Sequence, residues 1–387
     1  MGSPHPLWSR GFRPFFLGAG LFAIATMIVW LAAYRFGLAP DLAGITLFQW
    51  HAHEMVYGYA MAVIAGFLLT AAQNWTGVDT LHGPGLAGLL LLWLAARVMM
   101  LTGTAWLLPA AAADLAFAVV LFIAIARPVL KVRQRRQTPV LLVLALLAAG
   151  NAAFYLGALA GAPEWVARGV YGGFYLVLGM VLFMGRRVIP FFAERGVGYE
   201  VELRNSRWND VASFVFYALF LVAEVLAPGS LAGSLVAALL FVLNGLRLAG
   251  WHTPGIWRRP LLWSLYLAYA AIALGFLARA LVATGTLSPL LAVHTFALGG
   301  VGLITLSMMT RVALGHTGRN VHQPPAVAAL FLGLLIAAGL SRTLGVASDP
   351  GHYALWITLS GALWIAAFGL FAASVGPLLW RPRPDGA

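Results

Sequence analysis

The sequence predicts an all-helical protein that crosses a membrane about twelve times, and three observations carry this prediction. Apolar residues make up 61% of the 387 residues, whereas charged residues make up only 9%. A soluble protein cannot cover its surface with so few charges. The apolar residues gather in runs of about 20, the length that spans a bilayer as a helix. The charges lie in short groups between these runs.

Each expected span is an apolar run that ends at charged, glycine or proline residues. The first run follows Arg10 and Arg13 without a small-residue cleavage site, so we expect it to be retained rather than removed as a signal peptide. No soluble domain and no internal repeat is visible, so 1–387 is expected to form a single transmembrane domain. The expected spans are 15–36, 54–73, 86–101, 106–126, 139–160, 168–189, 209–227, 231–250, 261–283, 289–310, 325–346 and 353–377.

The positions of lysine and arginine predict that both ends of the chain lie in the cytoplasm. With twelve spans, 19 of the 24 lysine and arginine residues fall in inside segments. Three fall outside (Arg35, Arg168 and Arg342) and two within spans (Arg97 and Arg279). Cytoplasmic loops of membrane proteins carry such an excess. The net charge of +12 therefore reflects membrane topology, and the expected partner is the lipid bilayer rather than nucleic acid.

The chain contains no cysteine, which limits the metal chemistry open to it. Disulfides, iron–sulfur clusters, thiolate copper sites and covalently attached c-type haem are excluded. Any metal or haem would be held by histidine, methionine, tyrosine or carboxylate side chains. Neutral imidazole is suited to both haem iron and copper.

Histidines near the outer ends of two spans are the first candidate ligands. His51 and His53 stand at the start of the second span, within WHAHEM (50–55). The alternative is an interfacial belt of tryptophan and histidine, although two histidines and a glutamate before a span are more than such a belt needs. Residues two apart on a regular helix point about 200° apart, so these two imidazoles cannot easily share one metal if the helix is regular there. Either they serve two partners, or the turn before the span is irregular. His294 lies early in the tenth span, where it is either a ligand or a packed, hydrogen-bonded side chain.

His316 marks a second histidine location at the inner side of the membrane. It follows His294 by 22 residues, which is about 33 Å along an unbroken helix. That distance equals the hydrocarbon thickness, so these two histidines are not expected to share a site.

Ionisable residues within the spans are costly and invite functional hypotheses. Arg97 and Arg279 lie in the outer thirds of the third and ninth spans. They either extend to the interface or hold an anion, such as the propionates of a haem. Asp114 could pair with Arg97 or belong to a proton route. Glu224, near the outer end of the seventh span, is expected to be solvated.

Four stretches of the sequence resemble signatures of the NnrS family. They are LWSRGFRPFFL (7–17), WHAHEMVYGYAMAVIAGFLLTAAQNWTG (50–77), GRRVIPFF (185–192) and MMTRVALGHTGR (308–319). The resemblance implies a multi-pass bacterial inner-membrane protein that binds haem and copper and takes part in responses to nitric oxide, including nitrosative stress. By position it implies metal or haem ligands at His51, His53, His294 and His316. Tyr266 stands where the family usually has histidine, and it is either a haem ligand or a packed residue.

The functional expectation is therefore a haem-binding, haem–copper membrane protein that acts in nitric oxide metabolism, detoxification or stress response. Reduction of nitric oxide by such a protein would need electrons, and no flavin or nicotinamide motif is visible. An enzyme of this kind would need a quinol or a redox protein as electron donor. The alternatives are a transporter of haem, metal or a small solute, and an accessory factor for assembly of another respiratory enzyme. A tightly retained, visible haem would favour the first class over a transporter.

Overall fold

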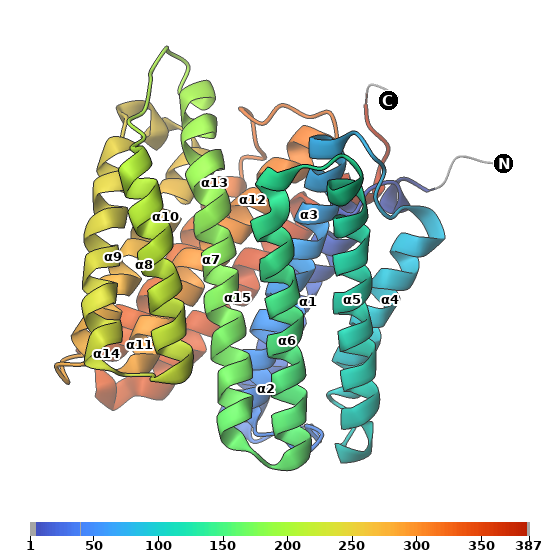
Figure 1. Cartoon of the computed structure of the whole chain (residues 1–387), viewed down its shortest axis with the longest axis vertical. Coiled ribbons are helices and arrows are strands. Elements are labelled where there is room, and N and C mark those ends of the chain that lie inside the picture. The colour runs from blue at the N-terminus through green and yellow to red at the C-terminus, as the bar shows by residue number, and fades with distance from the viewer. Residues whose placement is uncertain (1–4, 39, 385–387) are drawn as a thin grey trace. The chain divides into compact units, whose positions relative to one another are not determined.

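The prediction of an all-helical membrane protein is confirmed by the computed structural model, which describes residues 5–38 and 40–384 (Figure 1). Within these ranges the only extended pairing is an isolated bridge between Asp41 and Thr102. Eleven helices in the described chain are long and apolar enough to cross a membrane. They are Phe12–Phe36, Leu47–Thr76, Thr104–Lys131, Arg135–Ala160, Pro163–Gly196, Arg207–Leu226, Leu231–Gly250, Pro260–Val282, Pro289–His316, Ala328–Ser348 and Pro350–Ser374.

Five of these eleven spans of the described chain are single α-helices, and the other six also contain 3₁₀ or π-helical segments. The labelled helices are α1 Phe12–Phe36, α2 Leu47–His53, α3 Met61–Thr76, α4 Gly83–Met99, α5 Leu107–Lys131, α6 Thr138–Ala160, α7 Pro163–Gly196, α8 Arg207–Leu226, α9 Leu231–Gly250, α10 Pro260–Val282, α11 Pro289–His294, α12 Leu303–His316, α13 Ala328–Leu340, α14 Val346–Ser348, α15 Tyr353–Ser374 and α16 Gly376–Trp380. Short 3₁₀ turns precede several of them at Pro6–Trp8, Thr104–Trp106, Arg135–Gln137, Pro254–Arg258 and Pro350–His352.

The third expected span, 86–101, corresponds to the helix α4, which is shorter than the eleven long helices. It contains 17 residues, Gly83–Met99, and it is apolar. A span of about 17 residues is at the lower limit for a bilayer. The even number of crossings, and with it the prediction that both termini lie in the cytoplasm, depends on this helix.

Three spans are interrupted by π-helical segments, which the sequence analysis did not predict. Glu54–Ala60 lies between α2 and α3, and Thr295–Gly302 lies between α11 and α12. A third segment, Ser341–Gly345, separates α13 from α14. A π-helix carries an extra residue in its turn and occurs frequently at functional sites. The first two segments each begin directly after a candidate ligand, His53 or His294.

Contacts divide the chain into two compact units, each formed from more than one stretch of sequence. Unit 1 contains the described residues of Met1–Val177, Val312–Arg319 and Phe368–Ala387. Unit 2 contains Leu178–Arg311 and Asn320–Ala367. The chain passes between the units within α7, within α12, directly after Arg319 and within α15. The expectation of a single domain over 1–387 stays a prediction.

The core of unit 1 is built around aromatic residues at the start of α1. Phe12, Phe15 and Phe16 are at most 1% exposed. Phe15 packs against Phe117 of α5, with ring centroids 6.0 Å apart. The amide of Phe12 donates to the hydroxyl of Thr70 on α3, so α1 and α3 are fixed in register.

Unit 2 is held at one end by a polar network that joins α7, α8, α9 and α10. Asp210 pairs with Arg186 and, at 2.9 Å, with Arg247. Arg247 also donates to the hydroxyl of Tyr269 at 2.8 Å, and Tyr269 donates to Asn244 at 2.5 Å. Each charged side chain of this network therefore has a partner of opposite charge.

Candidate functional site

The candidate ligands His51 and His53 lie on one helix but face different surroundings. The ring of His51 stacks on Trp30, with centroids 4.3 Å apart. His53 is fully buried, and its ring stacks on Phe154 with centroids 4.2 Å apart. The helix α2 is regular over both residues, so their opposite directions follow from the helical repeat. The expectation that they do not share one metal agrees with this geometry.

Both ring nitrogens of His53 have partners inside the protein. Nδ1 lies 2.9 Å from Glu54 Oε1, and Nε2 lies 2.9 Å from Asn151 Oδ1. Asp114 Oδ2 is 3.7 Å from the same Nε2. His53 therefore belongs to a polar cluster, and a metal could reach either nitrogen only by displacing one of these oxygens.

Arg97 is the cation at the centre of this cluster. Its Nη1 lies 3.2 Å from Glu54 Oε1, and its Nη2 pairs with Asp114 Oδ2. Asp114 Oδ2 also accepts from Asn151 Nδ2 at 3.0 Å and from the hydroxyl of Tyr155 at 3.1 Å. The prediction that Asp114 pairs with Arg97 is confirmed. All of these charged groups are at most 3% exposed.

The cluster contains two carboxylates and one guanidinium, and some of its polar atoms have no hydrogen-bond partner. Glu54 Oε2, Asp114 Oδ1 and Arg97 Nε are buried and make no hydrogen bond within the described chain. The terminal nitrogens of Arg97 approach the carboxylates as ion pairs without the alignment of hydrogen bonds. Buried polar atoms normally have partners, so this cluster is a functional candidate on chemical grounds.

The π-helical segment Glu54–Ala60 and the close approach of α6 to α7 place the cluster. Tyr57, in this segment, donates its hydroxyl to the carbonyl of Gly169 on α7 at 2.6 Å. Trp93 of α4 donates to the carbonyl of Gly58 at 3.0 Å. A Cβ on Gly169 would stand 2.6 Å from the backbone nitrogen of Phe154. Glycine at 169 thus allows α6, which carries Asn151 and Tyr155, to lie directly against α7.

In unit 2, His294 ends α11 and has a hydrogen bond typical of a metal-ligating histidine. Its Nδ1 lies 2.7 Å from the carbonyl oxygen of Leu290, one turn earlier. Because a carbonyl only accepts, Nδ1 carries the proton and Nε2 is the basic nitrogen. Metal-ligating histidines nearly always donate their other N–H in this way.

Arg279 of unit 2 is paired with a carboxylate, as is Arg97 of unit 1. Its Nε donates to Glu224 Oε2 at 2.9 Å, and its Nη2 lies 2.8 Å from Glu224 Oε1. The expectation that Glu224 is solvated is wrong, because this residue is only 6% exposed. The cause is the fork of Arg279, which binds both carboxylate oxygens and compensates their charge. Contact of Arg97 and Arg279 with haem propionates stays a prediction. In such a contact, each guanidinium would bind a propionate in addition to its carboxylate partners within the protein.

The inner candidates are packed against aromatic residues. His316 lies at the end of α12 in unit 1, where its ring is 5.5 Å from that of Phe12. In unit 2, Tyr266 donates its hydroxyl to the carbonyl of Leu248 at 3.2 Å and lies near His252 and Trp257. These contacts are those of a packed tyrosine. Within the described chain, no group of three or more histidine, aspartate or glutamate side chains is arranged to hold a metal ion.

Comparison with known families agrees with this architecture. The family model described as NnrS protein matches residues 6–383, nearly the whole sequence. The chain belongs to the NnrS family. The match contains all four stretches that resemble NnrS signatures, so the predicted family is confirmed. No curated protein matches this NnrS family member.

Sequence reasoning missed several members of the buried cluster of this NnrS protein. Asn151 and Tyr155 lie four residues apart, so they share one face of α6. A polar amide in an otherwise apolar span was the signal that could have identified them. The π-helical segments left no comparable signal, because their backbone pattern depends on how neighbouring helices pack.

Proposed function

We propose that this NnrS family member is a haem-binding protein of the bacterial cytoplasmic membrane, with copper as a second metal, and that it acts in nitric oxide metabolism, detoxification or stress response. Two observations support the class of protein: the family match over residues 6–383 and the eleven long apolar helices of the described chain. The observation in this chain that carries the haem proposal is the hydrogen bond of His294.

His294 fits the role of an axial haem ligand. Its Nδ1–H is held by the carbonyl of Leu290 at 2.7 Å, so the imidazole is oriented and Nε2 is its basic nitrogen. The residue is partly exposed rather than enclosed, so its ring can be reached from outside the helix. The π-helical segment Thr295–Gly302 follows directly, and such segments are frequent at functional sites.

His53 fits less well in the conformation that the structure shows. Its contact with Glu54 resembles the carboxylate–histidine pairing of metal sites. Its other nitrogen, however, is in contact with Asn151. We therefore place the haem ligand at His294, whereas His51, His53 and His316 remain predicted ligands for haem or copper.

When bound, haem iron would supply the position at which nitric oxide coordinates. The chain's own contribution is to orient the imidazole and to exclude water from the surrounding helices. Nitric oxide is small and apolar, so it can arrive through the lipid without a wide channel. Reduction of nitric oxide would in addition need an electron donor, for which we propose a quinol or a redox protein.

The direct test is the haem and copper content of the full chain purified in detergent. We expect His294→Ala to lose most of the haem that a pyridine haemochrome assay finds in the unchanged protein. His82→Ala is the matched control, because His82 also directs Nδ1 at a backbone carbonyl, that of Thr80, but is exposed in a loop. This control should keep its haem.

Two results would contradict the proposal. Unchanged haem in His294→Ala would contradict the placement of the haem ligand at His294, and unchanged haem in His53→Ala as well would contradict haem binding by either histidine. A colourless protein that moves haem, metal or a small solute across vesicles would instead indicate a transporter.

A further inference from the structure

Arg311 differs from the other buried arginines of the described chain. Five arginines are at most 8% exposed: Arg13, Arg97, Arg247, Arg279 and Arg311. Arg13 donates to two backbone carbonyls, and the next three pair with carboxylates. Among the described residues, no carboxylate lies within ion-pairing distance of Arg311. Its charge is buried without a counter-charge from the protein.

The contact that Arg311 does make leaves its hydrogen-bond donors available. Its guanidinium carbon lies 3.9 Å from the ring centroid of Phe192, a cation–π contact that uses the face of the group. The five N–H donors point outward in the guanidinium plane. A buried charge without a partner is costly, so an anion from outside the chain is the expected partner.

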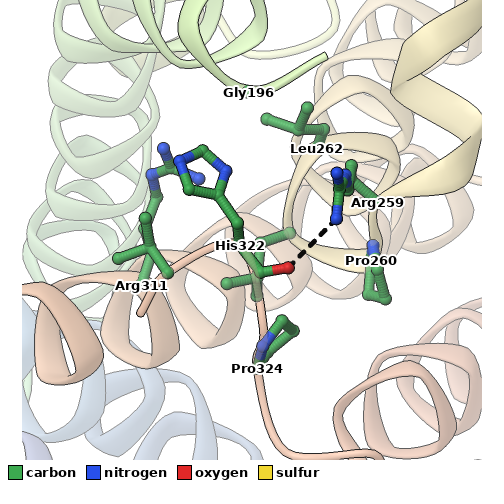
Figure 2. Close-up of a pocket in the computed structure, with 9 residues that line it drawn as sticks. Gly196, Arg259, Pro260, Leu262, Arg311, His322 and Pro324 are labelled. Carbon is green, nitrogen blue, oxygen red and sulfur yellow. Dashed lines mark hydrogen bonds between the residues drawn. The ribbon is translucent and has the colours of Figure 1, made fainter. Parts of the chain in front are cut away.

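Arg311 lines a small pocket that contains a second arginine and a histidine (Figure 2). Figure 2 shows the side chains of Arg311 and His322 on one side of this pocket and those of Arg259 and Leu262 on the other. None of the described lining residues is an aspartate or a glutamate. The pocket is therefore positive.

The start of α10 adds to this positive character. Arg259 directly precedes the helix, and Pro260 is its first residue. The N-terminus of a helix carries a partial positive charge and binds anions. Arg259 Nη1 also donates to the carbonyl of His322 at 3.2 Å, so the loop that carries His322 is attached to this helix start.

The size of the pocket defines what can enter it. Its volume is about 10 Å³, which is room for one water-sized atom. One oxygen of a larger anion fits, while its remaining oxygens would stay at the rim near Arg259 and the exposed His322. A tetrahedral oxyanion has this shape, and guanidinium groups match phosphate oxygens in geometry.

We propose that Arg311, Arg259 and His322 bind a phosphate group, carried either by the headgroup of an anionic phospholipid or by free phosphate. Both arginines lie in segments predicted to face the cytoplasm, where basic pockets at helix ends bind anionic headgroups. This proposal does not depend on haem binding.

Thermal melting of the delipidated full chain in an uncharged detergent tests the proposal. Phosphatidylglycerol, phosphatidylcholine and inorganic phosphate are added separately at constant ionic strength. The variants are Arg259→Gln and Arg311→Gln, and the control is Arg258→Gln, which changes the exposed neighbouring arginine outside the pocket. If Arg311→Gln does not fold, the half-buried Arg259→Gln decides alone.

We expect phosphatidylglycerol to raise the melting temperature of the unchanged protein and of Arg258→Gln, and both pocket variants to lose most of that shift. Phosphatidylcholine should have little effect. An equal shift with inorganic phosphate would identify the phosphate group itself as sufficient, whereas a shift with phosphatidylglycerol alone would identify the lipid. The proposal is overturned if neither anion stabilises the unchanged protein, or if Arg259→Gln responds as fully as Arg258→Gln.

Discussion

Mutual charge compensation determines how Arg97, Arg279 and their carboxylate partners are arranged within the spans. Arg97 is shared by Glu54 and Asp114, and Arg279 is bound by both oxygens of Glu224. The sequence offered the pair of Arg97 and Asp114 as one of two alternatives, because the two residues lie in neighbouring spans, and the structure confirms the pair. It could not assign Glu54 or Glu224 to partners, since depth along a helix does not define which face a side chain occupies.

Removal of the central cation tests this arrangement. Arg97→Gln leaves Glu54 and Asp114 buried in one cluster without their common partner. Breaking a buried ion pair costs roughly 3–5 kcal/mol, so the variant should melt at a clearly lower temperature in detergent. Arg168→Gln, an exposed arginine on the same unit, is the control. Equal melting temperatures for the two variants would show that the cluster does not stabilise the fold.

Among the helices, the apolar pattern identified the spans and several of their starts, such as Leu231 and Pro289, but placed the start of the second span too late. The second span was expected at 54–73, whereas the helical stretch is Leu47–Thr76. A hydropathy pattern detects only the apolar part of a helix that crosses the lipid. The polar residues within 49–54 are too hydrophilic to be included, although this stretch is helical. His51 and His53 therefore lie within a helix, one turn earlier than the predicted span. The π-helical segments depend on packing between helices and left no pattern in the sequence.

The contact between α6 and α7 gives a prediction for these elements. In Gly169→Ala, the new Cβ would stand 2.6 Å from the backbone nitrogen of Phe154 and 2.7 Å from the carbonyl of Gly150. Backbone atoms cannot move aside alone, so the two helices must separate and the melting temperature should fall. Gly88→Ala in α4 is the control, because no atom lies within 4 Å of its added Cβ. A Gly169→Ala protein as stable as Gly88→Ala would contradict the close contact.

For the whole molecule, the sequence predicted the fold class and nearly all of the spans. The number of crossings is even only if α4 crosses the membrane, and this helix has 17 residues. The excess of lysine and arginine in alternate loops predicts that α4 does cross. The side of the membrane on which each loop lies is predicted from charge and stays a prediction, whereas the sequence does not define which faces of distant spans meet.

Because the chain has no native cysteine, its topology can be mapped with single introduced thiols. His82→Cys and Thr104→Cys place exposed thiols on the two sides of α4. We expect a membrane-impermeant thiol reagent to label Thr104→Cys in intact spheroplasts and His82→Cys only after lysis. Labelling of both or of neither in intact spheroplasts would show that α4 does not cross the membrane.

We propose that an imidazole of this chain holds a haem whose iron is accessible to nitric oxide. The most direct measurement is the visible spectrum of the reduced, purified protein before and after addition of nitric oxide without oxygen. We predict a Soret band that shifts when nitric oxide is added. A colourless protein, or a Soret band that does not move, would contradict the account.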